Sequence, residues 1–225
     1  MITNQNIAKL RGMILDKGVP HIDKNGDEYY TYTLFVPRES KAHDEINVTI
    51  PNRVCNHYDL YVGLNIIIEG EYRSYNVDRG NESGRSHLFL SVFAKKIIRL
   101  EDEESDYEKE KALKNNQYIQ LTGKICKEPI FRITPSGRYI TELLISIERE
   151  KKKSVKRYDI IPCICWGNNA IRAKEYGKWD IISINGRIQS RKYYKKINED
   201  KVEMTAYEVS ISKMKNLSKE EQDIW

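Results

Sequence analysis

The sequence predicts a mostly β protein built from two tandem five-stranded barrels, each with one short helix. Three observations predict it: an internal repeat of about 111 residues, strand-like runs bounded by turn residues within each copy, and a length of 225 residues, which is enough for two domains. A hydrophobic fraction of 40% supplies apolar cores, while a mean hydropathy of −0.66 predicts very polar surfaces around them.

Four segments of the first half recur in the same order in the second half. The matched pairs are Leu10–Ile14 with Leu121–Ile125, Tyr32–Arg38 with Leu143–Arg149, Asp44–Asn52 with Asp159–Gly167, and Ile66–Gly70 with Ile182–Gly186. Four matches in one order are unlikely to arise by chance, so we predict a duplicated domain. The predicted division is a divergent first domain at 1–100, an acidic linker at 101–115, a second domain at 116–215 and an acidic tail at 216–225.

Each copy is predicted to be mostly strand. In the second copy, runs rich in β-branched and aromatic residues cover 139–147, 160–166 and 181–194. Thr134–Gly137, and Asn25 with Gly26 in the first copy, are predicted to be tight turns, because Asn and Gly adopt positive φ. A short helix is expected over 168–176, starting on an Asn168 cap and stopping at Gly177. Five strands with a helix after the third predict an OB-fold barrel, with another small Greek-key barrel as the alternative.

The net charge of +5 is unevenly distributed along the chain. Residues 1–100 carry +1, the connector 101–115 carries −4, residues 116–215 carry +10 from 21 basic and 11 acidic side chains, and the last ten carry −2. A basic domain favours a polyanionic partner, because Lys and Arg release condensed counterions when they neutralise phosphates. A well-solvated basic surface is the alternative explanation.

The second copy resembles the bacterial single-stranded DNA-binding protein family, the replication proteins that coat unwound DNA. The resemblance rests on an ordered series: Asn116, Leu121–Gly123, Glu128 and Pro129, Arg132, Thr134–Gly137, Ile145–Arg149, Asp159–Gly167 and Gly186–Tyr193. The first copy is a more divergent version, with Pro51 where the second has Trp166. Tandem copies are similar to the Deinococcus and Thermus proteins, which implies a homodimer with four OB domains. The resemblance also implies roles in DNA replication, recombination and repair.

The strand after Gly186 is the predicted centre of binding. Side chains alternate along a strand, so Arg187, Gln189, Arg191 and Tyr193 are expected on one face. Bases stack on aromatic rings while cations follow the phosphates, which suits binding without sequence preference. Tyr193 and Trp166 also match positions where the family carries stacking aromatics. The alternative for both is a structural role, with Trp166 closing a core strand because its apolar neighbours share its parity.

Further candidates surround this strand or lie in the first copy. The stretch 149–157 carries six basic residues and is predicted to form a loop that closes over a DNA backbone, with a plain solvated loop as the alternative. The additional candidates are Tyr194, Lys192, Arg149, Lys151, Lys152, Lys153, Lys156, Arg157, Tyr158, Arg132 and Arg138, and in the first copy Tyr75, Arg73 and Arg38. The first copy is expected to bind more weakly and to contribute more to assembly.

The two acidic segments are expected to stay off DNA. The connector is predicted to be a short helix or a flexible spacer. The chain ends in Asp223, Ile224 and Trp225. The family resemblance implies that this tail recruits replication and repair proteins, although the acidic run is shorter and ends in Trp rather than Phe. The alternative is that the apolar end packs against its own barrel.

Other functions receive less support from the sequence. We find no phosphate-cradling glycine loop or nucleophile motif, and we expect no catalytic residue, cofactor or metal. Cys163 and Cys165 are expected to point to opposite faces of their strand, which argues against joint metal binding. With no long apolar window and no secretory signal, a soluble cytoplasmic, nucleoid-associated protein without membrane contact is expected. A non-catalytic OB-fold replication-restart protein and an RNA-binding protein are the alternatives.

Overall fold

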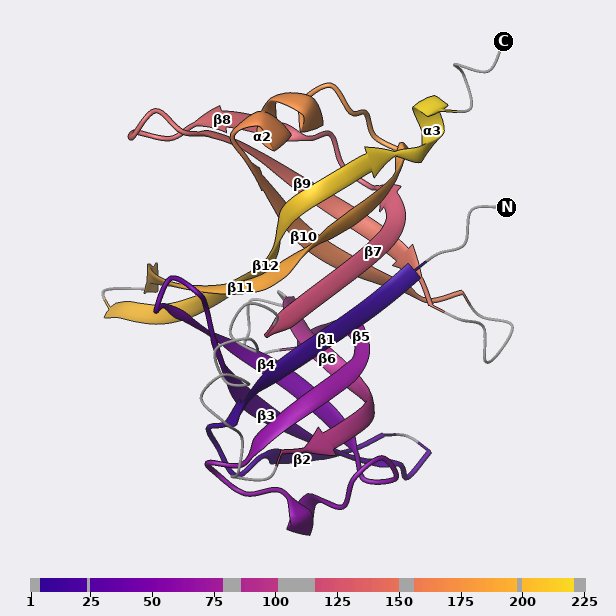
Figure 1. The fold of residues 1–225 in the computed structure, drawn as a ribbon, viewed down its shortest axis with the longest axis vertical. Coiled ribbons are helices and arrows are strands. Elements are labelled where there is room, and N and C mark those ends of the chain that lie inside the picture. Colours follow the sequence, from indigo (N-terminus) through magenta and orange to yellow (C-terminus); the bar gives the residue numbers. More distant parts are fainter. Residues whose placement is uncertain are drawn as a thin grey trace.

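The computed structural model describes residues 5–23, 25–78, 86–100, 116–149, 156–197 and 200–220. Twelve strands form one continuous sheet in the order β2-β3-β4-β6-β5-β1-β7-β11-β12-β10-β9-β8. Additional pairings of β3 with β1 and of β7 with β9 close this sheet into two barrels, one above the other in Figure 1. The prediction of a mostly β protein with two OB-fold barrels is confirmed.

The first barrel is closed by five long strands. Its elements are β1 (Gln5–Ile14), β2 (Val19–Ile22), β3 (Glu28–Pro37), β4 (His43–Pro51), the 3-10 helix η1 (His57–Asp59), β5 (Asn65–Asp78) and β6 (Ser86–Arg99). The closed circuit runs β1, β5, β6, β4, β3 and back to β1, and only β4 and β6 pair in parallel. The short strand β2 extends β3 outside this circuit.

The second barrel repeats the same circuit. Its elements are β7 (Gln117–Ile125), β8 (Ile130–Ile133), β9 (Tyr139–Glu148), β10 (Tyr158–Trp166), the helix α2 (Asn168–Ala173), β11 (Ile181–Ile197) and β12 (Asp200–Asn216), followed by α3 (Leu217–Glu220). The circuit runs β7, β11, β12, β10, β9 and back to β7, again with one parallel pair, β10 with β12. Helix α2 is shorter than expected, and its N-cap is Gly167 rather than Asn168, so the predicted Asn cap is wrong.

Glycines that recur in both copies allow close approach between strands. A Cβ on Gly70 would lie 2.1 Å from the carbonyl oxygen of Phe93, and one on Gly186 would lie 2.3 Å from that of Ser210. Both glycines sit at a register shift, between Glu69 and Gly70 in β5 and between Asn185 and Gly186 in β11. The repeated glycine therefore marks a β-bulge that bends each long strand out of its barrel.

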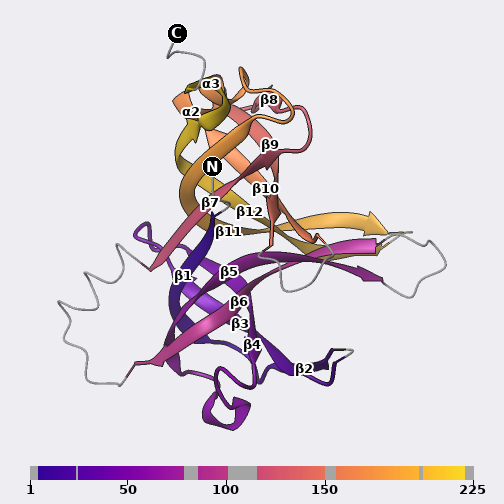
Figure 2. The same cartoon turned by 90° about the vertical axis from the view of Figure 1, so that its right-hand side faces the viewer.

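The two barrels are joined by an antiparallel pairing of β1 with β7. Beyond their bulges, the long hairpins leave the barrels as two arms. The first arm is the part of β5–β6 beyond Gly70, and the second arm is the part of β11–β12 beyond Gly186. Both arms extend from the same side of the molecule (Figure 2). Each arm contacts the opposite barrel, β11 against β4 and β5 against β10.

Candidate nucleic-acid interface

Two equivalent contacts fix the arms to the barrels. Asp44 of the first barrel accepts a hydrogen bond from the backbone N–H of Ser190 at 2.7 Å, and Ser190 Oγ accepts one from the N–H that follows Asp44 at 2.9 Å. In the second barrel, Asp159 accepts from the N–H of Ser74 at 2.8 Å, and Ser74 Oγ accepts from the N–H that follows Asp159 at 2.8 Å. The two copies of the repeat thus make the same contact with each other in both directions.

Each of these aspartates also binds an arginine. Arg38 donates from Nε and Nη2 to Asp44, and Arg149 donates from the same atoms to Asp159 at 3.0 and 2.6 Å. Both carboxylates are fully buried. The hydrogen bonds to Asp44 raise the pKa of Arg38. The guanidinium groups of Arg38 and Arg149, which the sequence suggested for phosphate contact, are therefore held by buried carboxylates of their own barrels.

The base of the second arm is also engaged with protein. Arg187 Nη1 lies 3.3 Å from a carboxylate oxygen of Asp44, and its Nη2 donates to Gln189 Oε1 at 3.3 Å. Burial, together with the neighbouring charge of Arg38, lowers the pKa of Arg187. Gln189 is 9% exposed and donates to Glu208 Oε1 at 2.6 Å. These two side chains of the predicted binding face lie in the seam between the barrels.

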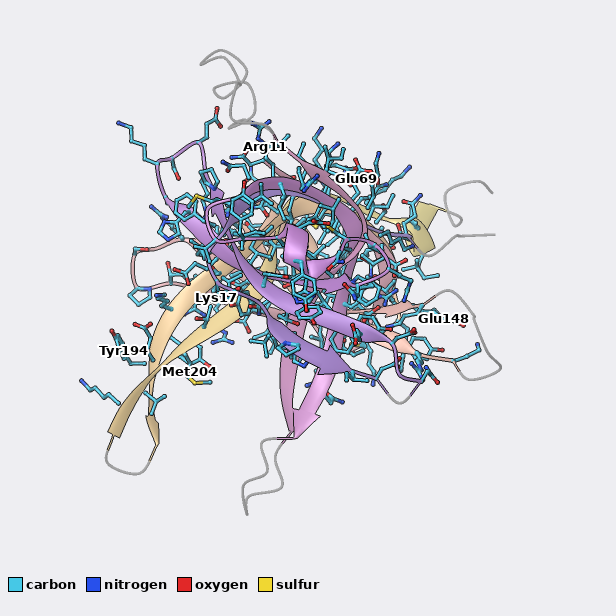
Figure 3. The ribbon with its side chains drawn as sticks, turned by 90° about the horizontal axis from the view of Figure 1, so that it is seen from below. Arg11, Lys17, Glu69, Glu148, Tyr194 and Met204 are labelled. Atoms are coloured by element: carbon cyan, nitrogen blue, oxygen red, sulfur yellow. The ribbon has the colours of Figure 1, made fainter. Side chains whose placement is uncertain are left out.

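The outer part of the second arm has a different environment. Arg191 is exposed, and its Cζ lies 6.0 Å from the ring centroid of Tyr193. Tyr194 is 68% exposed and donates to Glu203 Oε2 at 3.2 Å, and Lys192 Nζ lies 3.4 Å from Glu203. Figure 3 shows Tyr194 on the projecting hairpin, away from the packed side chains of the barrels. The outer arm thus carries Arg191 with Tyr193 on one face and Lys192 with Tyr194 on the other.

Strand β10 presents aromatic side chains at both of its ends. Tyr158 is 47% exposed and Trp166 is 40% exposed, and they share the outward side of the strand, while Ile161, Cys163 and Cys165 are buried on the other side. Eight residues separate the two aromatics, or about 26 Å along the strand. Trp166 therefore lies on the outer surface of the barrel.

Two arginines lie near Trp166 on the edge formed by β8 and β9. In the ladder, Trp166 is opposite Ile140, and Ile140 is opposite Arg132, so the three side chains form one cross-strand row. Arg132 Nη2 donates to Glu142 Oε2 at 2.7 Å and is mostly exposed. Arg138 is exposed after the turn formed by Thr134–Gly137. This edge offers solvent-facing cations beside an aromatic ring.

The first arm presents its candidate residues less openly. Arg73 Nη2 lies 2.7 Å from Glu71, and its Cζ lies 3.8 Å above the ring of Phe93. The ring of Tyr75 lies 5.1 Å from Cζ of Arg149, and burial raises the pKa of its hydroxyl. Tyr75 therefore contributes to the contact between the first arm and the second barrel, whereas Arg73 is held by residues of its own hairpin.

Part of the predicted basic loop and the tail fall outside the described residues. These are Lys151, Lys152 and Lys153 in the loop and Asp223, Ile224 and Trp225 in the tail. At the described ends of the loop, Arg149 N donates to Arg157 O at 2.9 Å, and Lys156 Nζ lies 3.8 Å from Glu148. Lys156 and Arg157 are both exposed.

The prediction that Cys163 and Cys165 point to opposite faces is wrong. Residues two apart on a strand share a face, and both thiols are buried inside the second barrel. Burial raises the pKa of Cys163 and raises that of Cys165 to about 12. Among the described residues there is no group of three or more His, Cys, Asp or Glu side chains placed to hold a metal ion.

The sequence analysis missed the aspartates and serines that fix the arms. Asp44 and Asp159 begin matched segments of the repeat, and Ser74 and Ser190 both lie four residues after the repeated bulge glycine. Polar residues that recur at buried positions of a duplicated domain are a signal for a shared interface. The sequence does not show that each arm packs on the opposite barrel, so it could not identify which aspartate contacts which serine.

The comparisons with known proteins agree with this architecture. The sequence profile of the single-strand binding protein family matches residues 116–217. The match therefore covers the second barrel and not the first. The single-stranded DNA-binding protein of Clostridium tetani is 35% identical over 78 residues, which cover 33% of this chain and 54% of that protein. Single-stranded DNA-binding protein B of Bacillus subtilis is 28% identical over 94 residues, 40% of this chain and 80% of that protein.

The structural match extends over both barrels of the chain. The crystal structure of the wild-type single-stranded DNA-binding protein of Thermus aquaticus covers 96% of this chain and 94% of its own, with a TM-score of 0.70 and 17% identity. This match shows that the two chains share the tandem two-barrel fold. The chain spans about half the length of the curated relatives it matches first. In the described part of the chain, no helix is long and apolar enough to cross a membrane.

Proposed function

We propose that this chain binds single-stranded DNA without sequence preference, chiefly through the second barrel. The observation that carries the proposal is the set of aromatics on the surface of that barrel and its arm, the exposed Trp166, Tyr158 and Tyr194 and the half-buried Tyr193, within a domain of net charge +10. Every base has a π-face, so stacking on these rings tolerates any sequence and contributes about 1–3 kcal/mol per base. The family match of residues 116–217 supports the same ligand.

The cations are proposed to act in two ways. The exposed ones, Arg191, Lys192, Arg157, Lys156, Arg132 and Arg138, contact phosphates directly, together with the basic loop at 151–153. Arg38, Arg149 and Arg187 act as positioning residues, because they bind the aspartates that hold the arms against the barrels, and Gln189 acts within the second arm by bonding Glu208. Their contribution to binding is then to fix the direction of the second arm and its tyrosines.

The first barrel is proposed to bind DNA more weakly. Its sequence carries a net charge of +1, its candidate Arg73 is paired with Glu71 on the same strand, and Tyr75 packs against Arg149 of the second barrel. We propose the domain division 1–100, 101–115, 116–215 and 216–225, with the first domain serving assembly. Two chains would then form a homodimer with four OB domains.

The biological role that fits this binding is in DNA replication, recombination and repair. We propose a binding protein with no catalytic activity, located in the cytoplasm at the nucleoid, whose tail residues Asp223, Ile224 and Trp225 contact other replication and repair proteins. The family match supports these assignments. An RNA ligand is the second candidate, since stacking does not read the sugar.

The test is a titration with oligo(dT), followed by intrinsic tryptophan fluorescence at several salt concentrations. We expect oligo(dT) to quench the fluorescence, and the logarithm of the affinity to fall steeply with the logarithm of the salt concentration. Duplex DNA and RNA should compete much more weakly. Trp166→Ala and Tyr193→Ala should each reduce affinity, while Tyr58→Ala, at the far end of the first barrel and 84% exposed, should not. Equal affinity for duplex DNA, or no loss in the first two variants, would contradict the proposal.

A further inference from the structure

Trp179 has a backbone conformation that is unusual for a large residue. Its φ is +78°, and Lys41 is the other residue besides glycine with positive φ in the described part of the chain. A Cβ is disfavoured in this left-handed region, and the disfavour is greatest for bulky side chains. Such a residue persists only where the surrounding structure holds it, and it is a reason to look for function.

The first barrel shows what the fold requires at this position. There Gly63, with φ +94°, donates its N–H to Ile14 O at 2.9 Å, and Trp179 makes the equivalent bond to Ile125 O at 2.8 Å. The next residue in each barrel accepts a bond at its carbonyl from the N–H of Ile14 or of Ile125. The two loops therefore make the same backbone hydrogen bonds, and in the first barrel Gly63 occupies the position that Trp179 has in the second.

The indole ring of Trp179 lies mostly in solvent, so packing of the ring does not offset the unfavourable backbone conformation. Trp179 is 63% exposed, and Lys178 Nζ lies 4.7 Å from its ring centroid. The segment between α2 and β11 that carries it lies at the end of the second barrel remote from the first barrel (Figure 1). An exposed tryptophan in a left-handed conformation, where glycine suffices, is not explained by stability of the fold.

The surroundings of the ring are basic. Trp179 N donates to Ile125 O at 2.8 Å, which brings the segment that carries Lys127 beside Trp179, and Lys178 Nζ lies 4.7 Å from the centroid of the ring. Lys127 and Lys178 are exposed. The nearby carboxylate of Asp180 is occupied, since it accepts bonds from Gly177 N at 3.1 Å and Asn216 Nδ2 at 2.7 Å. An aromatic ring flanked by lysines suits a polyanion that carries flat apolar groups.

We propose that Trp179 stacks against a base of single-stranded DNA that continues past α2 from Trp166. This inference rests on the proposed function and adds a second contact to it. Helix α2, six residues and about 9 Å long, lies between the two tryptophans in sequence. Lys174 at its C-terminal end lies 5.4 Å from the ring of Phe131 and supplies a cation beside the path. Lys178 and Lys127 neutralise phosphates next to the stacked base.

The first experiment is Trp179→Gly, which installs the residue of the first barrel. Its affinity is measured for oligo(dT) of about 4 to 24 nucleotides, a range that includes the site size of about 4–16 nucleotides of one OB fold. We expect an unchanged or higher melting temperature, because glycine relieves the left-handed backbone. Affinity for long oligonucleotides should fall about 5- to 150-fold, and affinity for short ones, which engage only the Trp166 surface, should not change. Trp179→Phe should retain most of the affinity, and Lys41→Gly, which relieves the same conformation elsewhere, should not reproduce the length dependence.

The second experiment uses the three tryptophans of the chain. With Trp166→Phe and Trp225→Phe, the remaining fluorescence belongs to Trp179, and long oligo(dT) should quench it and shield it from iodide. Equal affinity of Trp179→Gly and the wild type at every length, or no shielding, would overturn this inference. Failure of the wild type to bind single strands would instead overturn the proposed function, so the two failures are distinguishable.

Discussion

Asp159→Asn tests whether the arms are held by buried ion pairs. The substitution keeps the size of the side chain but leaves the guanidinium of Arg149 without its anion, and it weakens the bond from Ser74 N at 2.8 Å. Removing one partner of a buried ion pair costs about 3–5 kcal/mol, because the other charge remains buried and uncompensated. We expect a loss of this size in the free energy of unfolding, measured by urea denaturation.

Asp44→Asn should lower the free energy of unfolding by at least as much as Asp159→Asn. Asp44 faces both Arg38 and Arg187, so the loss of its charge leaves two cations close to each other in addition to weakening the bond from Ser190 N. Replacing the second pair entirely, with Arg149→Met and Asp159→Leu together, should cost less than Asp159→Asn alone, because no buried charge is left. This comparison separates the cost of an uncompensated charge from a general loss of packing.

The matched control is the exposed pair formed by Arg132 and Glu142. Their nitrogen and oxygen lie 2.7 Å apart, about as close as in the buried pair, but both side chains are largely exposed. Arg132→Ala should therefore cost only about 0–1 kcal/mol. A loss below about 1 kcal/mol for Asp159→Asn would put it in the range of surface pairs and refute the reasoning that burial of the pair fixes the arm.

The remaining predictions concern the binding surface, the bulge and the buried thiols. Tyr194→Ala should weaken oligo(dT) binding by about 1–3 kcal/mol without changing the melting temperature, since the ring is 68% exposed; an equal loss of stability would show a packing role instead. Gly186→Ala should strongly lower the free energy of unfolding, because its Cβ would lie 2.3 Å from Ser210 O. Gly26→Ala, with φ +82° and open space around the Cβ, should lower it by only about 1–2 kcal/mol. Similar unfolding midpoints for the two variants would contradict the explanation by close approach of the strands. Cys165, with its pKa raised to about 12 by burial, should resist a thiol reagent at neutral pH and react in urea, after the more accessible Cys55; rapid labelling of all thiols in the native protein would contradict this.

Periodicity and repetition explain why much of the fold was predictable. The alternation in β9 and β10 is visible as buried and less buried residues along each strand, and the repeated Leu-x-Gly and bulge glycine occur where strands approach too closely for a Cβ. These are local constraints, so they leave a local mark in the sequence. The helix cap was mispredicted because Asn168 is itself a good capping residue, and only the observed backbone shows that Gly167 occupies that position.

The candidate site was predictable in part. Trp166 was a candidate through the family resemblance, while strand parity favoured a core role for it; Trp166 is 40% exposed, and so is the neighbouring candidate Tyr194 at 68%. The predicted single face of β11 proved to be divided, since Arg187 and Gln189 lie in the seam and Arg191 and Tyr193 lie beyond it. Parity assigns a side chain to a face, but it does not show where along the strand another domain covers that face.

The sequence by itself determined that this protein is a duplicated β domain with a basic second copy, because composition, repetition and alternation are properties of the chain alone. Only the tertiary structure decided which cations are available to a ligand. Arg38 and Arg149 have the same chemistry as Arg132, yet the first two are bound to buried aspartates, and the third faces solvent. The physical reason is that strand pairing within each barrel places these two arginines beside an aspartate, and the arm of the opposite barrel then covers that ion pair.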